Sequence, residues 1–167
     1  MAQKINLKAA VAAGIAAGLV SGLVKLGWEN LMPPRTPERD ATNPPQKLLE
    51  QLGVPSEVTH ATYTYAGHQL PWVSYLVHFG FSAGFGALYS VGGQLAPWLK
   101  TGRGVPFGLA VWDVFHVELM PRLGTVPAAK DQPLEEHVSE ILGHAVWMWS
   151  TDLMATQLYQ QFNHHAD

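Results

Sequence analysis

Three side chains able to bind a metal or carry a proton recur at helical spacing near the end of the chain: His137, Glu140 and His144. Residues three and four positions apart lie on one face of an α-helix. Imidazole and carboxylate groups bind zinc, iron or copper, and imidazole also changes its charge near neutral pH. The rest of the stretch 133–152 is rich in apolar and aromatic residues. We therefore expect an apolar helix with one polar face, and that face should point into the protein.

Further ionisable side chains lie within or at the ends of three other apolar stretches. They are Lys25, Glu29, His78, Asp113, His116 and Glu118. Asp113 and His116 are predicted to share one helical face, whereas Glu118 points elsewhere. An ionised side chain at bilayer depth costs about 2.5–3.5 kcal/mol, so it is normally paired, turned inward or functional. We expect these residues to form one polar cluster with His137, Glu140 and His144.

Four apolar segments predict the elements that would position this cluster. Only 14% of the residues are charged, against about 25% in soluble domains, which favours a membrane protein. A bilayer core requires roughly 20 apolar residues per helix, and the predicted transmembrane helices are 8–30, 71–93, 104–120 and 137–159. The polar, proline-rich stretch 31–70 is predicted to be an external loop with a short helix near 46–52. The expected fold is all-α, a single membrane domain with four transmembrane helices in an antiparallel bundle.

The distribution of basic residues predicts the orientation of this bundle. Lys and Arg are concentrated in the short N-terminal segment and in one short turn, at Lys4, Lys8, Lys100 and Arg103. Short segments rich in Lys and Arg stay in the cytoplasm, so both termini are predicted to be cytoplasmic and residues 31–70 periplasmic. At about 1.5 Å per residue, one ionisable residue of each helix then lies roughly 8–12 Å below its outer end. These residues are Lys25, His78, His116 and His144.

Small residues recur every fourth position in the first helix, at Ala10, Gly14, Gly18 and Gly22. This pattern lets a second helix approach closely. The neighbour is either another helix of this chain, a second copy in a homo-oligomer, or a subunit of a larger membrane complex. Gly80 and Gly84 are predicted to be further close-packing positions.

Three interpretations of the polar cluster remain open. In a structural one, Lys25 pairs with a carboxylate and the histidines fix the packing of the helices; the candidate partners are Glu29, Glu118 and Glu140. In a second, His78, His116, Glu140 and His144 bind a divalent metal, or two of the histidines ligate a haem axially. In the third, protons reach His116, Glu140 and His144 and continue along Asp152 and Asp113.

Several function classes are excluded by composition. The net charge of −3, with basic residues scattered singly and in pairs, offers no surface for nucleic acid. The absence of cysteine excludes disulfides, thiolate metal sites, iron–sulfur clusters and covalent haem attachment. The sequence lacks a P-loop, a dinucleotide fingerprint and an H-E-x-x-H motif, and H-V-S-E reverses the order of the last. No enzymatic activity is predicted.

Several longer motifs carry a resemblance to a known family. They are GLVSGLVKLGWENLMPPRTP, YTYAGH, HFGFS, FHVELMPRLGTVP and HVSEILGHAVWMWS. Together they resemble the YagU-like family of bacterial inner-membrane proteins, which implies a multi-span inner-membrane protein and an association with acid tolerance. The matched motifs mark Lys25, Glu29, His78, His116, Glu140 and His144 as important. The first external loop is shorter than the resemblance implies and lacks cysteine.

The favoured hypothesis is a small inner-membrane protein, in contact with the lipid bilayer, whose periplasm-facing cluster senses or moves protons or supports the envelope in acid. The alternative is a metal- or haem-binding membrane protein, including an anchor or accessory subunit of a redox complex.

Overall fold

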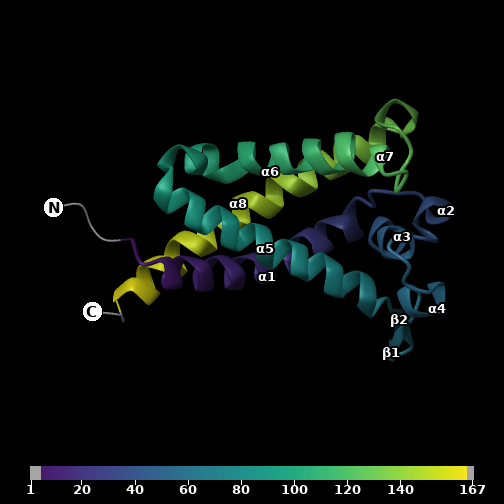
Figure 1. The fold of residues 1–167 in the computed structure, drawn as a ribbon, viewed down its shortest axis with the longest axis horizontal. Helices are drawn as coiled ribbons and strands as arrows, with labels where there is room; N and C mark the ends of the chain where they lie inside the picture. The colour runs from purple at the N-terminus through teal and green to yellow at the C-terminus, as the bar shows by residue number, and fades with distance from the viewer. Residues whose placement is uncertain (1–4, 165–167) are drawn as a thin grey trace.

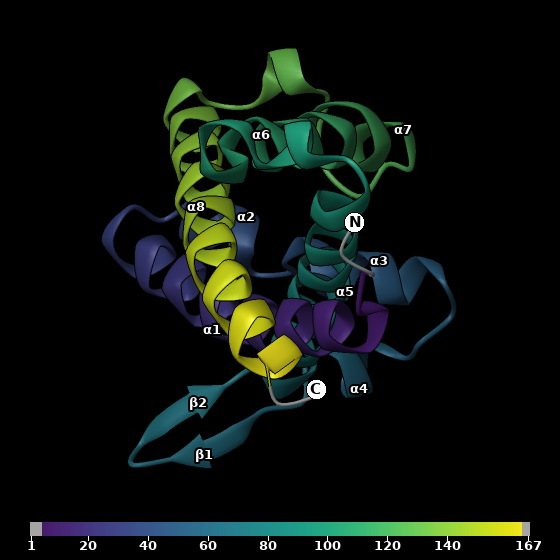
Figure 2. The same ribbon diagram turned by 90° about the vertical axis from the view of Figure 1, so that its left-hand side faces the viewer.

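Four long helical segments form the body of the protein in a computed structural model that describes residues 5–164 (Figures 1 and 2). They are α1 (Leu7–Leu31), α5 (Trp72–Leu95), the continuous segment of α6 (Val105–Trp112), η2 (Asp113–Leu119) and α7 (Met120–Arg122), and α8 (Leu134–His164). The 3₁₀-helix η1 (Pro97–Gly104) joins α5 to α6, and a second one, η3 (Ala129–Asp131), precedes α8. The all-α fold class is thereby confirmed. Lys4, used above to predict orientation, lies outside the described residues.

The helix bounds follow the apolar stretches of the sequence closely. Helices α1 and α5 begin and end within two residues of their predicted limits. Helix α8 begins three residues before the predicted start and ends five residues after the predicted end. Its earlier start follows Pro133, because proline fits the beginning of a helix but not its interior.

The start of α1 and the end of α8 lie at one end of the molecule, and the connections 32–71 and 123–133 lie at the other (Figure 1). From the η1 turn, α5 and the α6–α7 segment diverge toward the end that carries these connections (Figure 1). We refer to this end as the outer end.

The small residues of α1 pack against α5 of the same chain. A Cβ atom added to Gly14 would clash with the backbone of Gly86 and Ala87, and one added to Gly18 would clash with the backbone of Ser82. Two helix backbones therefore touch here. Because α5 fills this surface, a partner helix would have to bind elsewhere, contrary to the oligomer or complex contact considered for it.

Gly80 and Gly84 do not take part in close packing. An added Cβ at either position meets nothing within 4 Å. Helix α1 packs on the face of α5 that carries Ser82 and Gly86, and Gly80 and Gly84 lie two positions away around the helix. The prediction for these two glycines is wrong.

An aromatic core fills the middle of the molecule. Tyr89, Val111, Trp147 and Met148 are buried, and four phenylalanines pack against them: Phe81, Phe85, Phe107 and Phe115. Polar side chains in this core are hydrogen-bonded. Trp147 Nε1 donates to Ser82 Oγ over 2.6 Å, and Tyr89 OH donates to Asp152 Oδ1 over 2.8 Å.

The outer connection 32–71 is folded. It contains α2 (Pro37–Asp40), α3 (Pro44–Gln51), α4 (Ser56–Thr59) and a hairpin of β1 (Tyr63–Tyr65) and β2 (His68–Leu70). The helix expected near 46–52 corresponds to α3, whose Asn43 and Gln46 form a capping box. The hairpin was not predicted. We call residues 32–71 the outer loop.

Among residues 5–164, one helix is long and apolar enough by length and composition to cross a bilayer, namely α1. Helix α8 carries several acidic residues and α6 is short. All four predicted spans stay predictions.

Candidate functional site

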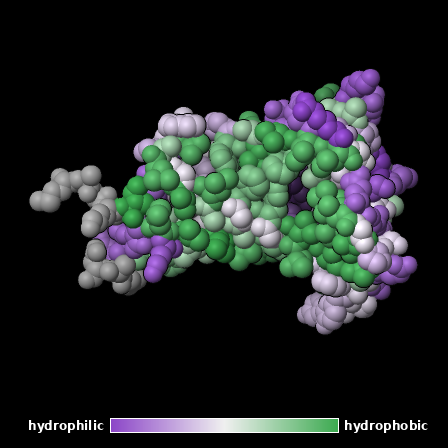
Figure 3. Space-filling view, in the orientation of Figure 1, coloured by the Kyte–Doolittle hydropathy of each residue, from purple (hydrophilic) through white to green (hydrophobic). Residues whose placement is uncertain are grey.

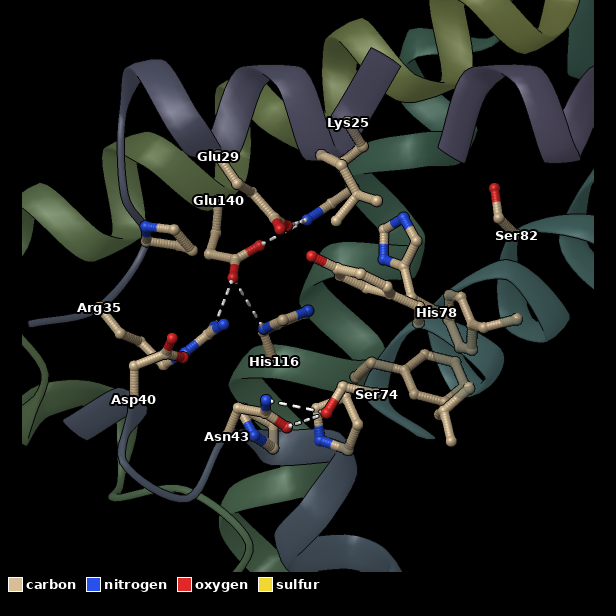
Figure 4. A pocket seen from close by; sticks show the side chains of 18 of the residues that line it. Lys25, Glu29, Arg35, Asp40, Asn43, Ser74, His78, Ser82, His116 and Glu140 are labelled. Carbon is tan, nitrogen blue, oxygen red and sulfur yellow. Dashed lines mark hydrogen bonds and ion pairs between the residues drawn. The ribbon is translucent and has the colours of Figure 1, made fainter. Parts of the chain in front are cut away.

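Glu140 is the centre of a buried charge network at the outer end (Figure 4). Its side chain is 8% exposed. The Oε1 oxygen lies 3.2 Å from Arg35 Nη1 and 3.9 Å from His116 Nδ1. The Oε2 oxygen lies 3.4 Å from Lys25 Nζ and 3.4 Å from His144 Nδ1. One carboxylate is thus shared by groups from α1, the outer loop, η2 and α8.

Both cations of this network have a second carboxylate. Lys25 also pairs with Glu29 one helical turn away, and Arg35 Nε donates to Asp40 Oδ1 over 2.9 Å. Burial opposes the charge of Arg35, but its ion pairs with Glu140 and Asp40 hold the pKa of the guanidinium above its ordinary value. Lys25 and Arg35 are therefore each bracketed by two carboxylates.

The local backbone explains how His116 reaches this network. Residues Asp113–Leu119 form a π-helix, in which the N–H of Met120 donates to the carbonyl of Phe115. A π turn takes up an extra residue and is frequent at functional sites. It separates Asp113, which is exposed, from His116, which packs against His144 with ring centroids 4.9 Å apart. The α-helical spacing that predicted a shared face does not apply here.

Ligand atoms of His116, Glu140 and His144 all lie within 4.8 Å of one another. His144 Nδ1 lies 2.8 Å from the carbonyl oxygen of Glu140. A carbonyl only accepts, so Nδ1 donates to it, and in the neutral ring Nε2 is an acceptor. The three side chains could hold a metal ion if the cations around Glu140 moved away.

A cavity of about 450 Å³ lies beside the network. It is bounded by α1, α5, η2, α8 and the outer loop (Figure 4). His78 lines this cavity and bonds through Nε2 to the carbonyl of Gly22, 3.0 Å away. Ser74, one turn earlier on α5, is hydrogen-bonded to Asn43 of the outer loop. His78 thus shares the cavity with Glu140, although its bonded partner is the α1 backbone.

Three residues predicted to belong to the cluster lie away from it. Asp113 is exposed, and Glu118 pairs with Arg122 on the surface. His137 lies 2.8 Å from the carbonyl oxygen of Ala129. Of the three carboxylates proposed for Lys25, the structure therefore places Glu29 and Glu140 beside it, but not Glu118.

The sequence analysis missed two arginines of the outer loop. Arg35 binds Glu140, and Arg39 Nη1 lies 2.7 Å from Glu136 Oε2. Both pairs join residues about a hundred positions apart in the chain. The available signal was a matched spacing: the arginines are four residues apart, and so are the two glutamates on one face of α8.

Asp152 does not continue the network toward the other end. The aromatic core, including Trp147 and Met148, lies between His144 and Asp152 along α8. Asp152 is buried and bonded to Tyr89 beyond that core. A proton path from His144 to Asp152 would have to cross this apolar layer.

Comparison with known proteins places the network and the cavity inside a span of the chain that matches one protein family. Residues 19–153, most of the chain, match the family described as "Protein of unknown function (DUF1440)". The chain belongs to the DUF1440 family. All residues that pair with Glu140 fall inside this span. No solved structure matches the chain.

One relative of this DUF1440 protein is the "Inner membrane protein YagU" of Escherichia coli (strain K12). The two chains are 32% identical over 167 aligned positions, which cover 86% of this chain and 81% of the relative. The resemblance to the YagU-like family is confirmed. The name of this relative supports the prediction that the chain is a membrane protein.

Proposed function

We propose that this chain crosses the bacterial inner membrane four times, with the outer end in the periplasm. Large apolar side chains are exposed on all four helical segments, including Leu23, Leu76, Val114 and Trp149. Hydrophobic residues form a band between two more hydrophilic ends in the space-filling view (Figure 3). Charged side chains such as Lys25 and Glu140 are buried instead. Apolar groups outside and paired charges inside suit a chain surrounded by lipid.

Topology is the first prediction. A reporter that is active only in the cytoplasm should work when fused after Asp167, because the basic residues favour that side. A reporter active only in the periplasm should work when inserted at the exposed hairpin tip, Gly67. Activity of the cytoplasmic reporter at Gly67 would show that the orientation is the reverse of the one proposed.

We infer further that the Glu140 network responds to acid. The observation that carries this proposal is that Arg35 and His116 both lie beside the same oxygen of Glu140, Oε1. Arg35 belongs to the outer loop and His116 to η2. A protonated His116 competes with Arg35 for that oxygen, so acid weakens one of the anchors that hold the outer loop to α8.

The charges around His116 come from every element packed near it. They are Lys25 and Glu29 of α1, Arg35, Arg39 and Asp40 of the outer loop, His78 of α5, and Glu136, Glu140 and His144 of α8. In this setting burial and the cations Lys25 and Arg35 oppose a charge on either imidazole, and Glu140 favours it. Protonation therefore alters how the cations share Glu140. The aromatic core below the network favours sensing over proton transfer across the membrane.

A distance measurement tests this response. The chain has no cysteine, so spin labels placed at exposed Glu57 of the outer loop and Leu119 of η2 would be unique. We expect the label-to-label distance to lengthen or broaden between pH 8 and pH 5, where histidine gains its charge. The same labels in a His116→Gln background should show little change.

Glu118→Gln provides the matched control, because Glu118 pairs with Arg122 on the surface of the same segment. It should keep the full pH response. Identical distance distributions at both pH values in the parent protein would refute the acid response. In the cell, the same response would support the envelope under acid stress.

A metal site is the second candidate, on the strength of the three ligand atoms within 4.8 Å. A cation there must displace Lys25 and Arg35 from Glu140, which opposes binding. Stoichiometric zinc in the purified protein, lost in His144→Ala, would favour this candidate. The 4.9 Å between the ring centroids of His116 and His144 leaves no room for a haem between them.

A further inference from the structure

The cavity beside Glu140 carries an excess of negative charge. Its ionisable lining comprises two basic residues, Lys25 and Arg35, and three acidic ones, Glu29, Asp40 and Glu140. With the histidines neutral, one negative charge is left without a matching cation in the lining. A bound cation would balance this charge, whereas a bound anion would increase the excess.

The pattern of ion pairs in the cavity is a second reason to expect a ligand cation and not a ligand anion. Each of Lys25 and Arg35 already touches two carboxylates. Among the described residues, Glu29 and Asp40 each have one ion-pair partner. Both retain oxygen lone pairs, and their side chains are 22% and 51% exposed. A ligand cation therefore meets accessible acceptors, whereas a ligand anion would have to displace a carboxylate.

The remaining walls of the cavity are mostly apolar and include four aromatic side chains. Tyr75, Phe81, Phe115 and Trp147 line it, with Leu26 and Met120. Aromatic faces attract cations, and more strongly where water is excluded. A cavity of 450 Å³ falls within the range of about 300–1,000 Å³ that small organic ligands occupy.

The cavity also has access from the apolar surface. The space-filling view shows a hollow whose floor is hydrophilic and whose rim is mostly hydrophobic (Figure 3). It lies where α5 and the α6–α7 segment diverge, and residues of both segments line the cavity (Figure 1). A ligand dissolved in the outer half of the bilayer could reach the charged floor without first crossing water.

We propose that this cavity binds a lipophilic organic cation, with its charge near Glu29 and Asp40 and its apolar body against Phe81 and Phe115. The binding site does not depend on the acid response proposed above. If that response is also correct, a proton on the histidines neutralises the excess charge, and the cation and the proton compete.

Two probes of similar shape and opposite charge test the proposal on the full chain in lipid nanodiscs. Tetraphenylphosphonium should bind saturably, and tetraphenylborate should bind at least about tenfold more weakly after subtraction of uptake by empty nanodiscs. Equal affinity for the two ions, or no saturable binding of the phosphonium, would overturn the proposal.

Three variants locate the bound charge. Glu29→Gln should weaken tetraphenylphosphonium binding about tenfold, and Asp40→Asn, at the more exposed position, should weaken it several-fold. Glu118→Gln lies outside the cavity and should leave the affinity unchanged. Full affinity in both cavity variants would overturn the assignment of the site.

Repeating the measurement at pH 5.5 separates the two proposals. Weaker phosphonium binding in acid, restored in His116→Gln, would support both. Binding that is charge-selective but independent of pH would uphold the cation site and contradict the acid response.

Discussion

Replacing Glu140 by glutamine is expected to lower the free energy of unfolding in detergent by about 3–5 kcal/mol. The variant keeps the size of the side chain but removes the charge that Lys25 and Arg35 share. Lys25 would keep Glu29 and Arg35 would keep Asp40, yet both cations would face an uncharged amide in a buried site. Removing one partner of a buried pair leaves the other desolvated, which explains the size of the effect.

The matched control is Glu118→Gln. Glu118 also pairs with an arginine, but its side chain is 48% exposed and that of Arg122 is 76% exposed. Exposed pairs contribute about 0–1 kcal/mol, so this variant should unfold close to the parent. Equal stability of the two variants would show that the Glu140 network is solvated and contributes little.

Coupling between Glu140 and His144 separates a shared network from independent packing contacts. Glu140→Gln and His144→Ala would be made singly and together. Effects on stability that add within about 0.5 kcal/mol would make these residues separate contacts. Strong non-additivity would agree with the single network seen in the structure, where His144 Nδ1 lies 3.4 Å from Glu140 Oε2.

The long helices could be predicted from the sequence because their signal is local. Continuous apolar stretches mark α1 and α5, and the helical spacing of Glu140 and His144 holds within α8. The approach of Lys25 to Glu140 was also predictable, because antiparallel helices of known length fix the depth of each residue.

The features that the sequence did not reveal depend on distant contacts or on unusual backbone. Arg35 lies in a proline-rich segment typical of a solvated loop, and only the fold brings it to Glu140, 105 positions away. The π turn around His116 has no local signature, so Asp113 was placed on the wrong side of its helix. The hairpin turn uses Ala66, with φ of 50°, where asparagine or glycine is the usual signal.

The packing of α1 on α5 sets the geometry beneath the network, and Gly18 lies at one of the backbone contacts between these helices. Ser82 Oγ donates to the carbonyl of Gly18 over 2.6 Å and accepts from Trp147. This chain of hydrogen bonds joins α1, α5 and α8 at the wall of the cavity, which Ser82 and Trp147 line. A change at Gly18 therefore acts on three helices at once.

Gly18→Ala is expected to destabilise the protein by about 2–3 kcal/mol, the upper part of the range for overpacking. The added Cβ clashes with backbone atoms of Ser82 and Ala83, so no side-chain rotation relieves it and α1 and α5 must separate. Gly84→Ala is the matched control on α5, because its Cβ would meet open space. Alanine there should stabilise the helix by up to about 1 kcal/mol. Thermal unfolding of both variants and of the parent protein in the same detergent would measure these effects. If Gly18→Ala is as stable as the parent protein, α1 and α5 do not pack backbone to backbone.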